Sequence, residues 1–155
     1  MITLMIGNIA GLIAFSIAKD YGVDAIVAYD NKELYKEMGF NVFNSIKDNL
    51  PDSKMLLSVH GREIVPVEIL KRYEFTANVH PFFNKYKGGS PIKRALEDWD
   101  RLADVTSHIM IEKVDSGEIL FQETMTIKGE TQQEIYAELY PLYAKVIKKT
   151  IEEKL

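Results

Sequence analysis

The chain has 155 residues, of which 46% are hydrophobic and 27% are charged, and it contains no cysteine. Its length suits one globular domain, residues 1–155, with a core large enough to fold unaided. The formal net charge of -4 argues against a general nucleic-acid binder, because such proteins usually carry a basic excess. The lack of cysteine excludes disulfides, thiolate metal ligands and a cysteine nucleophile, so we expect a reducing, cytoplasmic compartment.

The first part of the chain, residues 1–18, is apolar enough to imitate a signal peptide. It has no basic leader, and the segment 7–11 (Gly-Asn-Ile-Ala-Gly) interrupts the apolar run, whereas a membrane span needs about 20 predominantly apolar residues. We interpret residues 2–6 as a buried strand that leads into a helix over 9–19. We therefore expect a soluble protein without a membrane partner.

Short apolar runs then alternate with helical segments as far as residue 80. The pattern predicts strands at 25–28, 42–43, 54–59 and 75–80, and helices at 32–38 and 67–71. Alternation of this kind predicts an α/β fold with a largely parallel sheet. Right-handed crossovers would place the functional loops at the carboxyl ends of the strands.

The pattern changes in the second half of the chain. Ser90 and Pro91 are typical of a helix start, a capping hydroxyl with proline at the first helical position, and the helix should reach Trp99. Two extended stretches, 105–114 and 119–127, then predict a β-hairpin with Asp115 at its bend.

The C-terminal segment predicts a long amphipathic helix. Thr131 and Glu134 form a capping box, and apolar residues recur at helical spacing from Ile135 to Ile151. Pro141 should kink this helix or split it in two.

Asn78 and His80 are the first candidates for chemistry. Residues two apart on a strand point to the same face, so both side chains should project together near the end of the strand at 75–80. An amide donor beside an imidazole can hold a developing oxyanion while a proton moves nearby. The alternative is a histidine that only caps backbone groups. Asp115 could raise the pKa of His80 and orient its ring, or it could merely stabilise its own turn.

The stretch from His60 to Gln122 resembles the folate-dependent formyltransferases, which include the glycinamide ribonucleotide, methionyl-tRNA and sugar N-formyltransferases. Four segments match in the family's order: 58–66 resembles the loop that cradles the pterin, 78–81 the catalytic Asn-x-His-Pro motif, 85–92 the Tyr-Arg-Gly…Pro-Ile segment, and 105–108 with 114–117 the Thr-x-His strand and catalytic Asp-x-Gly. Each segment is weak evidence alone, but four in order are specific.

The resemblance implies a single Rossmann-like formyltransferase domain, with a mostly parallel sheet, helices on both faces and a C-terminal β-hairpin plus helix. It implies transfer of a formyl group from 10-formyltetrahydrofolate to an amine, such as an amino sugar or a phosphate-bearing amine. Asn78 would hold the formyl oxygen, His80 would relay protons or polarise that oxygen, and Asp115 would hold His80 and assist proton removal. His108 would support Asp115 or its loop without contacting the reactants. The residues implied to wall the pterin pocket are Arg62, Glu63, Ile64, Val65, Glu112, Val114, Ser116, Gly117 and Glu118.

The chain departs from the family's pattern at three places. The family's Ser-Leu-Leu-Pro after the His-Pro is replaced by Phe82-Phe83-Asn84, which is one residue shorter. The usual Thr-Gly before the Val-Thr is Ala103-Asp104. The N-terminal half is also shorter than usual. These departures are compatible with the formyl chemistry and put the identity of the acceptor in doubt.

Two features are candidates for binding the acceptor. Gly7 and Asn8 lie where a strand meets a helix, which suits phosphate, although a tight turn without a ligand is the alternative. The second is a basic cluster near Gly88, which could bind an anionic acceptor or be only a solvated surface; it consists of Lys85, Lys87, Lys93 and Arg94. We expect no nucleic-acid partner and leave an oligomer open.

A metal site is not expected, because no pair of histidines shows metal-ligand spacing. Two rivals to the transferase remain. One is a formyltetrahydrofolate hydrolase, with water as acceptor, and the other is a non-catalytic folate- or nucleotide-binding module.

Overall fold

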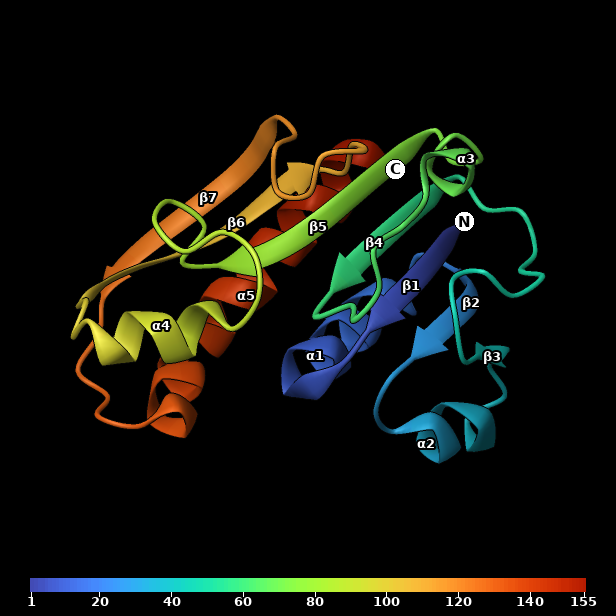
Figure 1. The fold of residues 1–155 in the computed structure, drawn as a ribbon. Coiled ribbons are helices and arrows are strands. Elements are labelled where there is room, and N and C mark those ends of the chain that lie inside the picture. Colours follow the sequence, from blue (N-terminus) through green and yellow to red (C-terminus); the bar gives the residue numbers. More distant parts are fainter.

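The computed structural model describes residues 1–155 as one seven-stranded sheet with helices on both faces (Figure 1). The strands are β1 (Ile2–Ile6), β2 (Val23–Ala28), β3 (Val42–Phe43), β4 (Met55–Val59), β5 (Phe75–Pro81), β6 (Leu102–Ile109) and β7 (Ile119–Thr126). The helices are α1 (Asn8–Ala18), α2 (Lys32–Glu37), α3 (Val67–Leu70), α4 (Pro91–Glu97) and α5 (Gln132–Lys154). None of them is both long and apolar enough to cross a membrane.

The sheet has the strand order β3-β2-β1-β4-β5-β6-β7. Strands β1 to β5 are parallel to one another, whereas β6 is antiparallel to both β5 and β7. The predicted fold class, a mostly parallel sheet followed by a hairpin and a helix, is therefore confirmed. The chain runs from β1 to β2 on one side and returns to β4 on the other, so the order reverses between β1 and β4. In open α/β sheets such a reversal is where ligands usually bind.

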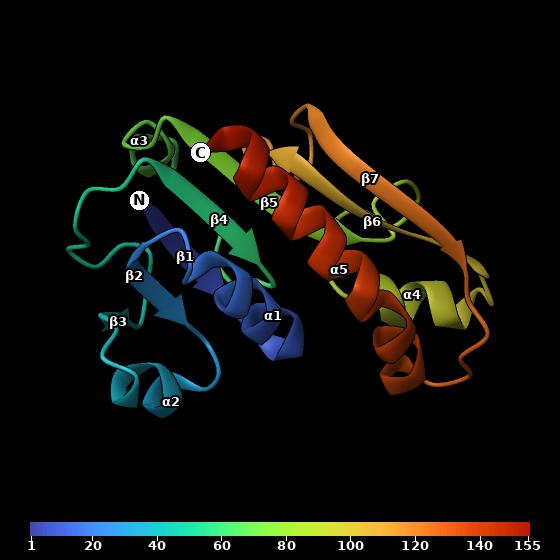
Figure 2. The same cartoon turned by 180° about the vertical axis from the view of Figure 1, so that it is seen from behind.

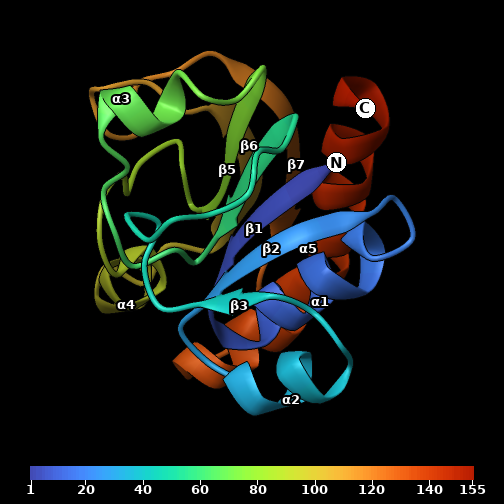
Figure 3. The same ribbon diagram turned by 90° about the vertical axis from the view of Figure 1, so that its right-hand side faces the viewer.

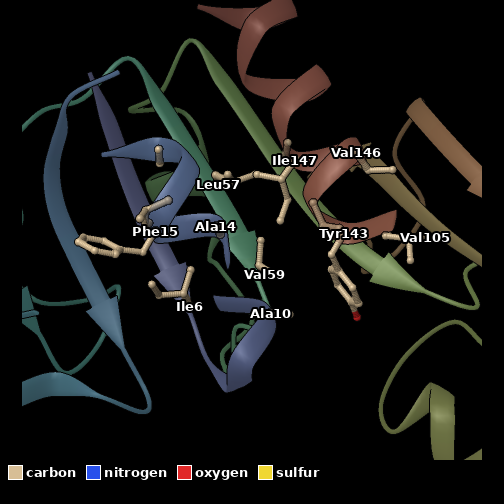
Figure 4. Close-up of a cluster of buried hydrophobic side chains, with 14 of the residues drawn as sticks. Ile6, Ala10, Ala14, Phe15, Leu57, Val59, Val105, Tyr143, Val146 and Ile147 are labelled. Carbon is tan, nitrogen blue, oxygen red and sulfur yellow. The ribbon is translucent and has the colours of Figure 1, made fainter. Parts of the chain in front are cut away.

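Helices α1 and α5 cover one face of the sheet side by side (Figure 2). Every residue of β1 and β4 is buried, which explains their unbroken apolar sequence. The small side chains Ala10 and Ala14 of α1 let that helix approach the sheet, and Tyr143 and Ile147 of α5 fill the neighbouring space (Figure 4).

The opposite face is covered by α3 and by the segment 44–53, as the view along the sheet shows (Figure 3). A smaller apolar cluster fills this side and includes Met5, Leu56 and Leu70. Because these elements cover the face only partly, side chains at the β5–β6 end of it remain open to a ligand.

The hairpin differs from the prediction in its turn. Strand β6 ends at Ile109 rather than at 114, and Asp115 lies in a long loop, 110–118, rather than at a tight bend. The N–H of Ile109 donates to the carbonyl of Glu118 at 2.8 Å, which closes this loop. Gly117 packs so tightly there that a Cβ atom would meet the carbonyl oxygen of Ile109 at 1.7 Å. The loop therefore folds back over the sheet instead of extending the strands.

Two helix predictions also need correction. Helix α4 ends at Glu97 rather than Trp99, and Ser90 makes no capping bond through its side chain because its backbone is left-handed (φ 52°). Helix α5 continues through Pro141 without splitting. Packing against α1 and the sheet along its length holds the helix together despite the missing N–H. At its start, Thr131 Oγ1 accepts the N–H of Glu134 at 3.1 Å, as predicted.

Candidate active site

Strands β5 and β6 bring three polar side chains to one face of the sheet. In the antiparallel register, Asn78 lies opposite His108 and His80 lies opposite Thr106. Asn78, His80 and His108 therefore form a compact group, as residues of one face of an antiparallel pair should. The prediction that Asn78 and His80 project together is confirmed.

Asp115 reaches this group from the 110–118 loop. Its Oδ2 lies 3.3 Å from His80 Nε2 and its Oδ1 lies 3.4 Å from His108 Nε2. The N–H of Gly88 also donates to Oδ2, at 2.6 Å. One buried carboxylate thus joins two histidines and the backbone of the 82–90 segment.

The surroundings of His80 favour its protonated form. Its Nδ1 lies 2.6 Å from the Pro81 carbonyl oxygen, and its Nε2 lies 3.1 Å from the Gly88 carbonyl oxygen and close to Asp115. All three neighbours are acceptors, so both ring nitrogens are suited to donate. Burial alone would lower the pKa of His80, but Asp115 and the two carbonyls outweigh it, and the pKa is raised.

Asp115 is held in its charged form by the same contacts. Burial would raise the pKa of its carboxyl group, but hydrogen bonds from His108, His80 and the Gly88 N–H hold it far below its usual value. These contacts favour a protonated imidazole beside an anionic carboxylate, at a site where both side chains are less than a tenth exposed.

His108 and Phe83 complete the cluster. The amide nitrogen of Asn78 lies 3.3 Å from His108 Nε2, and His108 Nδ1 lies 3.0 Å from the Ile109 carbonyl oxygen. The ring of Phe83 stacks on His108 with centroids 4.8 Å apart and meets His80 edge-on. His108 contacts both Asn78 and Asp115, so it lies where it can orient them.

A cavity of about 440 Å³ opens beside this cluster, between the loop after β4 and the 110–118 loop. Asn78, His80 and Asp115 line it. Seven of the other lining residues are hydrophobic, and the full set is Met5, Ser58, Gly61, Arg62, Glu63, Ile64, Val65, Leu70, Gly88, Gly89, His108, Met110, Ile111 and Val114. A wall that combines apolar side chains with a few polar groups is typical of sites for small organic ligands.

Only part of the predicted pterin wall lines this cavity. Arg62, Glu63, Ile64, Val65 and Val114 do, whereas the structure places the remaining four outside it: Glu112, Ser116, Gly117 and Glu118. The carboxylate of Glu63 is already engaged, because it accepts hydrogen bonds from Tyr29, Ser45 and Ile46. Glu63 thus contributes to the wall while its charge is used to hold neighbouring segments.

Several wall residues were not predicted, among them Met5, Leu70, Met110 and Ile111. Ser58, the first residue of the predicted pterin loop, lines the cavity and pairs with Asn78 across β4 and β5. Met110 and Ile111 could not have been found from the sequence, because their position depends on how the 110–118 loop folds back.

The predicted basic cluster does not act as one group. Lys85 pairs with Asp100 at 3.2 Å, and Arg94 donates to the carbonyls of Tyr86 and Lys87. The ammonium of Lys87 lies 4.7 Å from the centre of the Phe83 ring, next to the histidines. Gly88 contacts both His80 and Asp115, so the structure brings Lys87 and Gly88 to the site and ties Lys85 and Arg94 to their own surroundings.

Gly7 and Asn8 follow β1 at the point where the strand order reverses, and neither of them lines the cavity. There the Asp30 carboxylate accepts the N–H of Asn8 at 2.8 Å, and Arg62 pairs with the same carboxylate. Asp30 was not singled out in the sequence, because it follows β2 and is brought to Asn8 only by the parallel pairing of β1 and β2.

A family model described as formyl transferase matches residues 22–151. Methionyl-tRNA formyltransferases from Lactobacillus delbrueckii subsp. bulgaricus and Borrelia garinii subsp. bavariensis are 30% and 34% identical over 103 and 116 residues. These alignments cover 64% and 74% of this chain, and the chain spans about a third (33%) of either relative's length.

Solved structures with the same fold have lower identity. Phosphoribosylglycinamide formyltransferase from Bacillus halodurans gives a TM-score of 0.79 at 17% identity, covering 97% of this chain and 94% of that one. A sugar N-formyltransferase from Shewanella sp. FDAARGOS_354 gives 0.75 at 18%, covering 97% and 67%. Formyltetrahydrofolate deformylase from Burkholderia mallei gives 0.71 at 15%, covering 96% and 62%. At these identities the likeness establishes the fold, which transferases and a deformylase share.

Proposed function

This chain belongs to the formyl transferase family, and we propose that it moves a formyl group from 10-formyltetrahydrofolate to an amine. Folate-dependent formyl transfer is the chemistry of this family. The observation that carries the proposal is the contact of His80 with Asp115, beside Asn78, at the end of an apolar cavity.

The chemistry needs stabilisation of a tetrahedral intermediate. The amine nitrogen attacks the formyl carbon, the carbonyl oxygen becomes an oxyanion, and collapse then breaks the bond from carbon to N10 of the folate. The amide of Asn78 and the protonated imidazole of His80 can both donate to that oxyanion. Donors that are already in place cost no reorganisation when the charge develops, which is why they accelerate such steps.

Two protons must move for the exchange to balance. The attacking amine loses one, and N10 of the folate gains one as it leaves. Asp115 is held as an anion and can accept the amine proton, directly or through water, whereas His80 carries a proton that it can deliver to the leaving nitrogen. The ion pair thus holds the two partners in the protonation states that the reaction requires.

The cavity supports a position for the donor. It is bounded by the 58–66 and 110–118 segments, and its apolar wall suits a flat pterin ring whose polar edges meet backbone groups. A pterin seated there would bring the formyl group of the folate to the end where Asn78 and His80 lie. Val65 and Leu70 are wall residues on one side, and Met110 and Ile111 on the other.

The acceptor in this proposal is a small amine rather than a nucleic acid. The net charge of -4 does not favour a polyanion. A hydrolase would use the same oxyanion contacts with water as acceptor, so the geometry of the site does not separate the two reactions.

The test supplies 10-formyltetrahydrofolate alone and then with a panel of amino sugars, their nucleotide-linked forms, glycinamide ribonucleotide and methionyl-tRNA. We expect formylated product with one amine and slow formate release without any. Formate release at the same rate with and without every amine would establish a hydrolase instead. Binding of the folate without turnover of any kind would establish a binding module.

A further inference from the structure

The turn between β1 and α1 has the features of an anion site. It lies where the strand order reverses, and the first backbone N–H groups of α1 point out of the helix there. Gly7 joins the two elements and donates its N–H to the Val59 carbonyl of β4 at 3.1 Å. A phosphate on the acceptor would be expected to bind at such a turn.

The protein supplies its own anion at this position. Asp30 Oδ2 accepts the N–H of Asn8 at 2.8 Å and a guanidinium N–H of Arg62 at 2.6 Å. The same nitrogen of Arg62 lies 3.2 Å from the side-chain oxygen of Asn8. Both the backbone donor and the nearest cation are therefore already bound to a carboxylate.

Packing at Gly7 shows how little room is left. A Cβ atom built on Gly7 would meet the carbonyl oxygen of His60 at 2.8 Å, Asp30 Oδ2 at 3.4 Å and Arg62 Nη2 at 3.5 Å. The contact with His60 is closer than van der Waals packing allows, whereas those with Asp30 and Arg62 are ordinary packing distances, so the Asp30 carboxylate lies directly against the turn.

This turn is close to the reacting groups. The carbonyl oxygen of His60 lies against Gly7, and the next two residues, Gly61 and Arg62, line the cavity that we assign to the folate. Arg62 also pairs with Asp30. The Asp30 turn therefore adjoins the wall of the cavity that His80 also lines.

We propose that Asp30 is a specificity-determining residue: by closing the β1–α1 turn with an internal carboxylate, it excludes acceptors that present a phosphate there and favours neutral, hydroxyl-bearing amines. The proposal deepens the proposed function and rests on it only where the identity of the acceptor is concerned. An incoming phosphate would have to displace Asp30 from both partners or accept its negative charge at contact distance. A hydroxyl group would instead find a free acceptor, because both bonds to Asp30 end on Oδ2.

The first experiment uses inorganic phosphate as the probe and needs no turnover. Amide chemical shifts of Gly7, Asn8 and Ile9 are followed during titration of the native chain, of Asp30→Ala and of the control Asp20→Ala. The control makes the same change in net charge at an exposed residue that follows α1. We expect Asp30→Ala to bind phosphate at these amides at least about tenfold more tightly than the native chain, and the control to behave like the native chain.

Two further variants keep this result interpretable. Asp30→Asn keeps the size of the side chain and an oxygen that can accept hydrogen bonds from Asn8 and Arg62. This variant should therefore keep the local structure of the turn. It should bind phosphate with an affinity between those of the native chain and Asp30→Ala. The double variant Asp30→Ala with Arg62→Ala should lose the increase in phosphate affinity that we expect for Asp30→Ala alone. Phosphate binding by the native chain at these amides, as tight as in Asp30→Ala, would overturn the proposal, and so would the absence of any gain in both Asp30 variants.

The second experiment compares one amino sugar with its phosphate monoester as acceptors. The ratio of their kcat/KM values should favour the neutral amine in the native enzyme and shift by at least about tenfold toward the phosphate in Asp30→Ala. An unchanged ratio would refute the role of Asp30 in acceptor choice. If the native chain formylated no amine at all, the proposed function would fail, whereas the phosphate titration would still decide whether Asp30 closes the turn.

Discussion

The carboxylate of Asp104 accepts a hydrogen bond from the backbone N–H of Phe83 at 3.0 Å and a second from Asn84 at 3.2 Å. Asp104 lies on β6 and is only 3% exposed, and the hydroxyl of Thr106 donates to it at 2.6 Å. Two of the three departures from the formyltransferase pattern, at 82–84 and 103–104, are thus in direct contact. The carboxylate of Asp104 holds the backbone of the 82–84 segment.

The hydrogen bonds of Asp104 also affect the surroundings of the two histidines. The loop held by Asp104 carries Phe83, whose ring stacks on His108 and meets His80 edge-on. A loosened loop would expose both histidines on the side away from the cavity. Asp104 therefore positions the aromatic cover of the site without touching any reactant.

We predict that Asp104→Asn lowers the free energy of unfolding by about 1–3 kcal/mol, because an amide group places a donor against the N–H groups of the loop. Urea denaturation measures the change. The matched control is Asp98→Asn at the exposed end of α4, where the carboxylate only accepts the Tyr86 hydroxyl, and it should change stability by less than about 0.5 kcal/mol. Equal effects of the two substitutions would show that Asp104 does not hold the loop.

Features of the site that depend on neighbouring residues were predictable from the sequence, whereas contacts between distant segments were not. Asn78 and His80 lie on the same face of β5 because of the two-residue period of a strand, and this was predictable from the sequence alone. Asp115 was identified by its motif, but the loop that brings it back to His80 was not, because the closing contact of Ile109 with Glu118 leaves no trace in local pattern. Asp30 and Asp104 were missed as contacts for the same reason: each meets its partner through the register of neighbouring strands.

Asn78→Ala and His80→Ala should each reduce kcat by on the order of 10²-fold or more, because each removes one donor to the oxyanion or a proton carrier. Thermal unfolding should remain cooperative in both variants. Asn44→Ala removes an exposed amide after β3 and serves as the control, with activity close to that of the native chain. Near-native turnover by both site variants would rule out the mechanism proposed above.

The ion pair predicts a particular pH dependence. The pKa of His80 is raised above its ordinary 6.5, mainly by Asp115, and the imidazolium must lose its proton as the pH rises through that raised value. The stabilisation that His80 draws from Asp115 should therefore be full below pH 6.5 and be lost as the pH rises through the raised pKa, and the proton that His80 supplies to the reaction should be lost over the same range. Titration of the His80 ring by NMR should show a lower pKa in Asp115→Asn, and an unchanged value would contradict the assigned contact.

The pKa of His60 is shifted in the opposite direction, so its effect on the pH dependence of stability should also be opposite. Burial lowers its pKa to about 4, assisted by the charges of His80 and Arg62, and its Nε2 lies 2.7 Å from the buried Tyr143 hydroxyl. Because the unfolded chain binds this proton more readily, stability should fall as the pH drops from 6.5 towards 4. Roughly 2–3 kcal/mol of the loss between pH 7 and pH 4.5 should come from this residue alone.

His60→Asn is the appropriate variant for this test, because asparagine tolerates the positive φ of 56° at this position. It should be less stable than the native chain at pH 7 and should lose less stability on acidification. The difference between the two proteins in urea at pH 7 and pH 4.5 measures the contribution of His60. Parallel pH profiles would mean that the pKa of His60 is the same in the folded and the unfolded chain.

The final prediction separates the two cations that flank Gly88. Arg94 donates to the carbonyls of Tyr86 and Lys87, so Arg94→Gln should lower the free energy of unfolding by about 1–3 kcal/mol through the loss of these bonds. Lys87 is exposed beside the histidines and makes its one cation–π contact with Phe83, so Lys87→Gln should leave stability within about 0.5 kcal/mol of the native value.

The Lys87→Gln variant also tests where a negative charge on the acceptor is bound. With the β1–α1 turn closed by Asp30, an anionic group on the acceptor would have to lie near Lys87, and Lys87→Gln should then raise the acceptor's KM by about two- to fivefold. It should also weaken the rise of that KM with ionic strength, because exposed charges are screened over about 8–10 Å at physiological salt. The KM for the folate should change little, since Lys87 is not part of the cavity wall. If neither Lys87→Gln nor ionic strength changes the acceptor's KM, the acceptor is a neutral amine and Lys87 is only a solvated side chain.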